Sequence, residues 1–342
     1  MDVTIIPPKT ISLLTTYKCS AVCKNCCFGC NPRIREQLSV DEMKSYIDKS
    51  LSAYRSTLKV LVLTGGECML LGNKIYEIIK HGKENGLLVR IVTNGYWAKS
   101  YRIAFNKLQK LKNAGLYEIN FSTGDDHLEW VPYDNIVNGC MASVDLGLTC
   151  IVNVEKHDKS IFKVERFFKD ERLKSYLFPT NNEKPNLKIE SGVWIKFNKE
   201  SEITYKDLIV YNDNSKGCTT LFNTISINPY SQMLACCGLI SEYIIPLRLG
   251  SVKESEIKHL YESQFQDFLK IWLFIEGPMS ILKFIYEKRK VQYGFITGHI
   301  CNICSEIFKE RENIEILQLH YKEAMARVLL KYSLYAKSIC LT

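Results

Sequence analysis

The strongest constraint on the fold is a repeated alternation of short apolar runs and amphipathic helical segments between residues 10 and about 190. The apolar runs read as buried strands: ISLLTT (11–16), LKVLVLT (58–64), LLVRIVT (87–93), LYEINFS (116–122), LTCIVNVE (148–155) and LKIE (187–190). Repeated strand–helix units predict a parallel sheet with right-handed crossovers. Six such units are too few for a full eight-fold barrel. The sequence therefore predicts an α/β fold built on a partial (β/α)6 TIM-like barrel.

The segments between the strands carry helix signals of their own. Ser39 and Glu42 have the spacing of a capping box, which predicts that a helix begins there. The next predicted helix, NKIYEIIKHGKENG, ends at Gly86. Further helices are expected across 98–114, near 134–146 and at about 160–174.

The alternation stops after about residue 200. TISINPYSQMLACCG predicts two short strands around the turn at residues 229–231, and 249–272 predicts a helix preceded by a turn. Cys301 and Cys304 stand at the start of a predicted long final helix. We therefore expect two domains, a barrel at residues 1–205 and a smaller C-terminal domain at 206–342 with a short β-hairpin and helices.

The composition of the chain limits the cell compartment and the classes of partner that we expect. No window approaches the roughly 18 uninterrupted apolar residues that a membrane span needs, and MDVTIIPPKT lacks the pattern of a secretory signal. We expect a cytoplasmic protein with no membrane association, in which thiols stay reduced. The net charge of +8 comes from Lys and Arg residues spread along the chain. No nucleic-acid module is recognisable, so we expect no nucleic-acid partner.

Five of the 14 cysteines lie in one loop, KCSAVCKNCCFGC, after the first strand. In a reducing compartment such a cluster indicates metal ligands or catalytic groups rather than disulfides. A structural zinc site would need four ligands in paired spacings, whereas Cys19, Cys23 and Cys26 stand alone and the loop has no histidine. Cubane iron–sulfur clusters usually have four thiolate ligands. Three ligands would leave one iron open to bind something else.

The C-x3-C-x2-C spacing of Cys19, Cys23 and Cys26 resembles that of the radical S-adenosylmethionine (SAM) superfamily. The stretch Gly65-Gly66-Glu67, directly after the second strand, strengthens the resemblance. It implies a [4Fe–4S] cluster on the three cysteines, with SAM bound to the fourth iron and to Gly65-Gly66-Glu67 through its methionine amine. Cleavage of SAM then supplies a 5′-deoxyadenosyl radical, which the protein only has to position.

Other SAM contacts follow from the same resemblance. Asn94 in TNGYW and Ser122 in NFSTGDDH stand where the superfamily touches the ribose or carboxylate of SAM; turn chemistry and helix capping are the alternative interpretation. Asn25 departs from the superfamily, many members of which have an aromatic residue just before the third cysteine. The residues 125–127 form a polar group to which we assign no role.

A second set of thiols lies beyond the predicted barrel. It comprises Cys218, the doublet Cys236-Cys237, and Cys301-x2-Cys304. Such a set suits zinc or a second iron–sulfur cluster. It resembles the shortened auxiliary-cluster ("twitch") domain of some radical SAM enzymes. The resemblance implies a second [4Fe–4S] cluster on four ligands: Cys218, Cys236, Cys301 and Cys304.

Cys237 is left over, and it has a specific chemical use. An S–H bond is weaker than a peptide Cα–H bond, so a thiol can return a hydrogen atom to a Cα radical. Return to the opposite face turns an L-residue into a D-residue. CSAVCKNCCF, LTGGE, TNGYW, LACC and ICNICSEIF together resemble bacterial radical SAM peptide epimerases across about residues 10–310, and in that family the second cysteine of the doublet is the donor.

This resemblance implies a ribosomally synthesised precursor peptide as substrate and an electron donor such as flavodoxin or ferredoxin. In the family an acidic residue closely follows the first auxiliary cysteine; the nearest candidate here is Asn223. The alternatives are a radical SAM enzyme that crosslinks its peptide through a thioether or carbon–carbon bond, a small-molecule dehydrogenase of the superfamily, and a zinc-stabilised binding protein. The two members of the Cys236-Cys237 doublet could also exchange roles.

The other cysteines receive a simpler interpretation. Cys68 follows Glu67 and could face the cavity, but we favour no role for it. Thiols outside the two sets commonly behave as small buried apolar groups. We interpret the following in this way: Cys27, Cys30, Cys140, Cys150 and Cys340.

Overall fold

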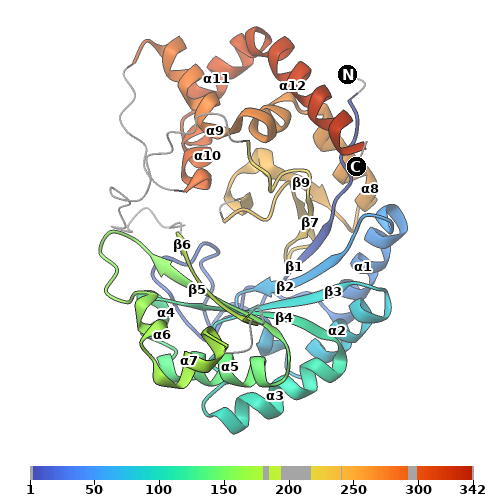
Figure 1. The fold of residues 1–342 in the computed structure, drawn as a ribbon. Coiled ribbons are helices and arrows are strands. Elements are labelled where there is room, and N and C mark those ends of the chain that lie inside the picture. The colour runs from blue at the N-terminus through green and yellow to red at the C-terminus, as the bar shows by residue number, and fades with distance from the viewer. Residues whose placement is uncertain (1–2, 180–184, 194–216, 240, 292–298, 341–342) are drawn as a thin grey trace.

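The computed structural model describes residues 3–179, 185–193, 217–239, 241–291 and 299–340 (Figure 1). The predicted domain boundary at residues 205–206 lies outside these ranges.

The predicted strands form one curved parallel sheet, which confirms the α/β partial barrel. The strands are β1 (Thr10–Thr16), β2 (Val60–Gly65), β3 (Leu88–Thr93), β4 (Leu116–Thr123), β5 (Thr149–Lys156) and β6 (Leu187–Val193). Each pairs in parallel with the next along the chain. All six strands therefore present their carboxyl ends at the same edge, where ligands gather in such folds.

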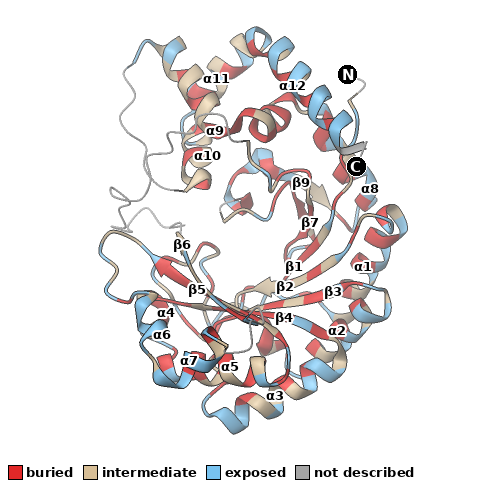
Figure 2. Ribbon diagram, in the orientation of Figure 1, coloured by how far each residue is buried: buried red, intermediate tan, exposed pale blue. Residues whose placement is uncertain are grey.

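Helices cover the convex face of this sheet, and the buried residues concentrate on the strands and on the helix faces turned toward them (Figure 2). They include α1 (Val40–Tyr54), α2 (Lys74–Glu84), α3 (Tyr101–Ala114) and α5 (Tyr133–Asp145). The predicted capping box is confirmed: Ser39 Oγ accepts from Glu42 N at 3.2 Å, and Glu42 Oε2 accepts from Ser39 N at 2.8 Å.

The prediction of one helix at about 160–174 is wrong. The chain there forms α6 (Glu165–Phe168), a 3-10 turn at Glu171–Leu173 and α7 (Lys174–Leu177). Phe162 and Phe167 pack on Tyr133 with ring centroids 5.8 and 5.1 Å apart, which holds the chain close to α5. Asp170 then caps the following turn by accepting from Arg172 N at 3.0 Å. These local caps and aromatic contacts replace a continuous helix.

The C-terminal region extends the same sheet. β7 (Thr224–Ile227) pairs in parallel with β1, and β8 (Gln232–Leu234) and β9 (Arg248–Ser251) add antiparallel strands. The full strand order is β6-β5-β4-β3-β2-β1-β7-β8-β9. The two predicted short strands are thus confirmed, whereas β9 occupies part of the segment for which a turn and one helix were predicted. That segment continues as α8 (Ile257–Ser263), and α9 (Phe268–Arg289) begins before it ends.

Three helices replace the single long helix predicted after Cys301. They are α10 (Ile300–Lys309), α11 (Arg311–His320) and α12 (Lys322–Cys340). The backbone of Glu310 is extended, which separates α10 from α11. Asn313 Nδ2 of α11 donates to Glu306 O of α10 at 3.0 Å across the corner between the two helices. Glu276 of α9 accepts from Arg327 of α12 at 2.9 Å. Burial would raise the pKa of Glu276, but the bonds from α12 outweigh it and lower this pKa to about 2, so an ion pair ties α12 to α9.

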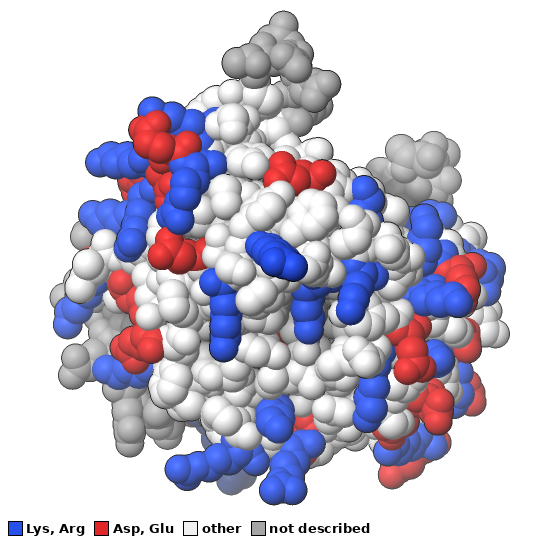
Figure 3. Space-filling view, turned by 90° about the horizontal axis from the view of Figure 1, so that it is seen from below, with Lys and Arg blue, Asp and Glu red and all other residues white. Residues whose placement is uncertain are grey.

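No described helix is both long and apolar enough to cross a bilayer. Lys and Arg side chains are spread over the face seen in Figure 3, with Asp and Glu side chains among them toward the edges.

Candidate functional site

The cysteine loop between β1 and α1 lies across the carboxyl edge of the barrel. Its first part is tied to the ends of neighbouring strands. Glu67 N, just after β2, donates to Lys18 O at 2.9 Å, and Asn94 Nδ2, just after β3, donates to Ser20 Oγ at 3.0 Å. The loop therefore sits where parallel sheets of this kind bind ligands.

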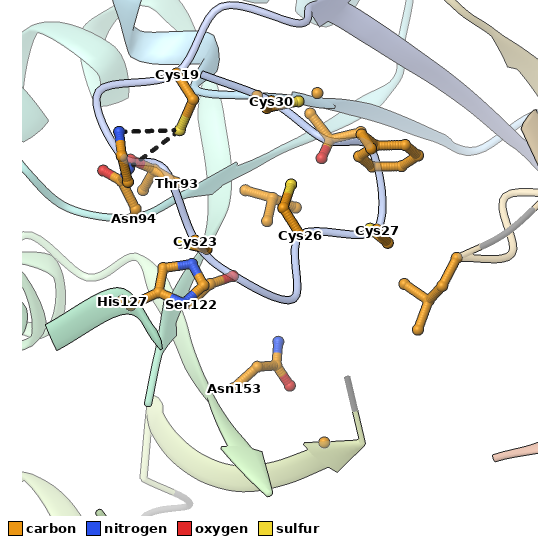
Figure 4. Close-up of a pocket in the computed structure, with 18 of the residues that line it drawn as sticks. Cys19, Cys23, Cys26, Cys27, Cys30, Thr93, Asn94, Ser122, His127 and Asn153 are labelled. Carbon is orange, nitrogen blue, oxygen red and sulfur yellow. Dashed lines mark hydrogen bonds between the residues drawn. The ribbon is translucent and has the colours of Figure 1, made fainter. Parts of the chain in front are cut away.

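A cavity of about 290 Å³ opens between this loop and the strand ends (Figure 4). Thr64, Val92 and Asn153 form part of its wall, and Leu239 reaches it from the C-terminal region. The cavity brings together seven of the predicted site residues: Cys19, Cys23, Cys26, Gly65, Gly66, Asn94 and Ser122.

The loop thiols differ in their electrostatics. The Cys30 thiol donates to Cys26, which lowers the pKa of Cys26 to about 6. Burial raises the pKa of Cys19 to about 12 and also raises that of Cys23. The thiolate is the metal-binding form, and the hydrogen bond from Cys30 favours it at Cys26.

The three predicted cluster ligands lie around one cavity. Among the described residues, no group of three or more His, Cys, Asp or Glu side chains could hold one metal ion. In an iron–sulfur cubane each thiolate binds a different iron, so the thiols surround a volume instead of converging on a point. Cys19, Cys23 and Cys26 line one cavity in this way.

Gly65 and Gly66 are required by the close approach of the end of β1 and of the residues that directly follow it. Gly65 has φ +128°, and a Cβ there would lie 2.4 Å from Thr16 O. A Cβ on Gly66 would lie 2.3 Å from Lys18 O. The two glycines thus allow the loop to rest on the end of β2, in addition to lining the cavity.

The Gly66→Ala variant is expected to lower the free energy of unfolding by about 1–3 kcal/mol, because the loop must move to admit the methyl group. Denaturant unfolding of the anaerobically purified chain measures this. Gly192→Ala is the matched control, because a Cβ at Gly192 would meet nothing within 4 Å. Equal unfolding free energies for the two variants would contradict the close-packing account.

Glu67 does not reach the cavity. Its side chain is fully buried, and its carboxylate accepts from Met69 N at 3.0 Å, Thr93 Oγ1 at 2.8 Å and Asn94 N at 2.7 Å. Burial raises its pKa to about 7. In this structure Glu67 fixes the β2 and β3 ends behind the cavity wall, and the sequence alone did not indicate that role.

Asn94 contacts the loop directly. Its Nδ2 donates to Cys19 Sγ at 3.6 Å as well as to Ser20, while Oδ1 accepts from Tyr96 N at 3.1 Å. Cys68, by contrast, is fully buried, and its thiol donates to Val92 O at 3.2 Å behind the cavity wall.

Of the remaining thiols, Cys27 and Cys30 are buried but also line the cavity, and Cys140 and Cys150 are fully buried. The side chain of Cys340 lies outside the described part of the chain.

The predicted auxiliary ligands also meet. Cys218, Cys236, Cys301 and Cys304 line a second, small cavity of about 20 Å³ at the end of the hairpin, next to α9 and α10. This is the space of roughly one water molecule. The absence of a group that could hold a single ion among the described residues applies to these four thiols as well, so the zinc and the iron–sulfur interpretations of this set both stay predictions.

The doublet splits between two environments. Cys236 is buried and lines the second cavity. Its Sγ lies close to Gly238, where an added Cβ would be 3.2 Å from the sulfur. Cys237 is exposed, and its Sγ lies 4.0 Å from Thr224 Oγ1.

The cavity face of the sheet carries Thr224. Thr224 pairs with Thr10, and Thr10 pairs with Val60. Residues four apart on a strand share a face, so Val60 faces the same way as Thr64, which lines the main cavity. Cys237 therefore lies beside Thr224, on the same face of the sheet as Thr64. Thr224 is level with Val60, four residues before Thr64, which is roughly 13 Å along the strand at about 3.3 Å per residue.

Asn25 and Asp126, to which no role was assigned from the sequence, are joined by hydrogen bonds in the structure. Asp126 Oδ2 accepts from Asn25 N at 2.6 Å and from Asn25 Nδ2 at 2.8 Å. His127, the next residue, lines the cavity. The signal available in the sequence was the polar run STGDDH directly after a strand.

No protein-family model matches the chain. The curated "putative peptide biosynthesis protein YydG" of Bacillus subtilis (strain 168) is 22% identical over 317 residues, which cover 90% of this chain and 94% of that protein. Among solved structures, native anSMEcpe with bound AdoMet aligns with a TM-score of 0.53 at 11% identity, over 97% of this chain and 100% of the other. At this identity the structural likeness shows a shared fold.

Proposed function

We propose that this chain is a radical SAM enzyme that modifies a ribosomally synthesised peptide, inverting L-residues to D-residues. The observation that carries the proposal is the cavity at the carboxyl edge of the barrel, which is lined by Cys19, Cys23 and Cys26 together with Gly65 and Gly66. The shared fold with an AdoMet-binding protein supports the cofactor, and the name of the B. subtilis relative supports a peptide substrate.

In this proposal Cys19, Cys23 and Cys26 hold a [4Fe–4S] cluster, and the SAM contacts come from Gly65, Gly66, Glu67, Asn94 and Ser122. When bound, these cofactors supply a 5′-deoxyadenosyl radical that removes a hydrogen atom from an unactivated carbon. The protein's own task is to hold the peptide Cα within reach of that radical and to exclude water.

Cys237 is the hydrogen donor in this proposal. Its S–H bond breaks, a Cα–H bond forms on the face opposite to the abstraction, and a cysteine thiyl radical remains. One electron and one proton must then restore the thiol, and an electron donor such as flavodoxin or ferredoxin supplies the electron. The exposure of Cys237 supports this role. Cys218, Cys236, Cys301 and Cys304 would hold the auxiliary cluster.

Incubation of the enzyme and a peptide substrate in heavy water tests the proposal. A thiol exchanges its hydrogen with solvent, so each inverted residue is expected to gain one deuterium at Cα, detected by chiral amino-acid analysis with mass spectrometry. A product that has lost two hydrogens and contains only L-residues would instead identify a crosslinking enzyme.

A further inference from the structure

Asp126 holds the tip of the cysteine loop. It lies in the short helix α4 (Asp125–Leu128), directly after β4. One carboxylate oxygen accepts both the backbone N–H and the side-chain amide of Asn25, at 2.6 and 2.8 Å. Asp126 and Asn25 are 7% and 3% exposed, so both bonds are shielded from water. Hydrogen bonds to a buried charged acceptor are among the stronger ones in proteins.

This contact fixes a part of the loop that the other anchors do not. The ties to the ends of β2 and β3 are at Lys18 and Ser20, near the beginning of the loop. Asn25 lies between Cys23 and Cys26, and Cys26 N donates to Cys23 O at 3.2 Å in the same turn. Asp126 therefore controls where this turn, with two of the proposed ligands, meets the barrel.

Asp126 is itself held rigidly. Its backbone N–H donates to Glu155 Oε2 at 3.2 Å, and Glu155 is fully shielded on β5. Gly124, with φ +142°, lets the two strands approach, because a Cβ there would lie 2.3 Å from Glu155 Cβ. The neighbouring Asp125 serves another segment, accepting from Ile161 N and Phe162 N at 2.8 Å each.

We propose that Asp126 is a positioning residue for the cluster loop, acting through Asn25 to place Cys23 and Cys26. The inference rests on the proposed function, since it takes these thiols as cluster ligands. It also accounts for the asparagine before the third cysteine: at that position this chain has a partner for Asp126 instead of an aromatic ring.

The pair allows a reciprocal test. Asn25→Asp puts two carboxylates face to face and is expected to release the tip. In the double variant Asn25→Asp/Asp126→Asn, the new amide oxygen can still accept from the backbone N–H of residue 25. Its Nδ2 can donate to the new carboxylate once the side chain turns, because in the parent chain one oxygen accepts both bonds. The double variant should therefore recover part of what the single variant loses, as interacting neighbours do in a double-mutant cycle.

The anaerobically purified full chain is treated with a ferrous chelator and iodoacetamide, and peptide mass spectrometry follows alkylation at each cysteine. Asp126→Ala and Asn25→Asp are expected to speed alkylation of Cys23 and Cys26 by about tenfold, which corresponds to about 1.4 kcal/mol. Cys301 and Cys304 should react at the unmodified rate. Asp125→Ala, the matched control, should change none of these rates, and the double variant should react more slowly than Asn25→Asp.

The proposal is overturned if Asn25→Asp and Asp126→Ala leave the two rates unchanged. It is also overturned if the double variant reacts as fast as Asn25→Asp. Iron and sulfide analysis of the unmodified chain reports separately on the proposed function, because the comparison of alkylation rates between variants does not depend on which metal is present.

Discussion

The Cys237→Ser variant is expected to cleave SAM to 5′-deoxyadenosine in the presence of peptide but to form no D-residue. Serine is close in size to cysteine, and the Thr224 hydroxyl, 4.0 Å from the thiol, lies too far for a hydrogen bond between two hydroxyls, so little packing changes. It cannot replace the chemistry, because an O–H bond is stronger than a Cα–H bond and hydrogen transfer from it runs uphill. Chiral amino-acid analysis and measurement of 5′-deoxyadenosine in one reaction give both values.

This variant separates the two peptide-modifying mechanisms. A crosslinking enzyme needs no donor thiol, so Cys237→Ser would leave its product unchanged. D-residues formed at the original rate by Cys237→Ser would rule out Cys237 as the donor. Loss of both 5′-deoxyadenosine and D-residues would indicate instead that Cys237 is needed for the auxiliary site. Cys237 would then be the ligand and Cys236 the spare thiol, the alternative that the sequence left open.

The Cys23→Ala variant is expected to lose SAM cleavage completely. The Cys23 side chain is partly exposed at the cavity, so the alanine variant loses few packing contacts. It takes away one of three thiolates that hold the proposed cluster, and two are too few for a stable cubane. 5′-Deoxyadenosine formation under reducing conditions measures the loss.

Cys27→Ala is the control for this prediction. It removes a thiol from the same loop and the same cavity, but one outside the C-x3-C-x2-C spacing. SAM cleavage should survive in Cys27→Ala. If Cys27→Ala lost activity and Cys23→Ala kept it, the ligand assignment would be wrong.

Local signals in the sequence were enough for the barrel. Strands such as 58–64 are apolar runs bounded by turns, and Ser39 with Glu42 marks a helix start through contacts within four residues. The failures are where distant contacts decide the structure. The segment 160–174 has helical spacing, but packing against Tyr133 and the Asp170 cap break it.

The candidate site shows the same difference between features set by neighbouring residues and features set by distant contacts. The spacing of Cys19, Cys23 and Cys26 singled them out because residues of one loop are close in sequence, and the structure places them around one cavity. The hydrogen bonds of the Glu67 carboxylate could not be predicted in this way, because its partners Thr93 and Asn94 are 26 and 27 residues away. The Asn25–Asp126 contact spans 101 residues, and only the folded barrel brings those two side chains together.

Electron paramagnetic resonance of the anaerobically purified, reduced protein, recorded with and without SAM, tests the central claim most directly. Three thiolates holding a cubane with one open iron predict equal amounts of iron and sulfide and a cluster signal that changes when SAM is added. Protein that contains zinc without sulfide, or a signal that SAM leaves unchanged, would contradict the account.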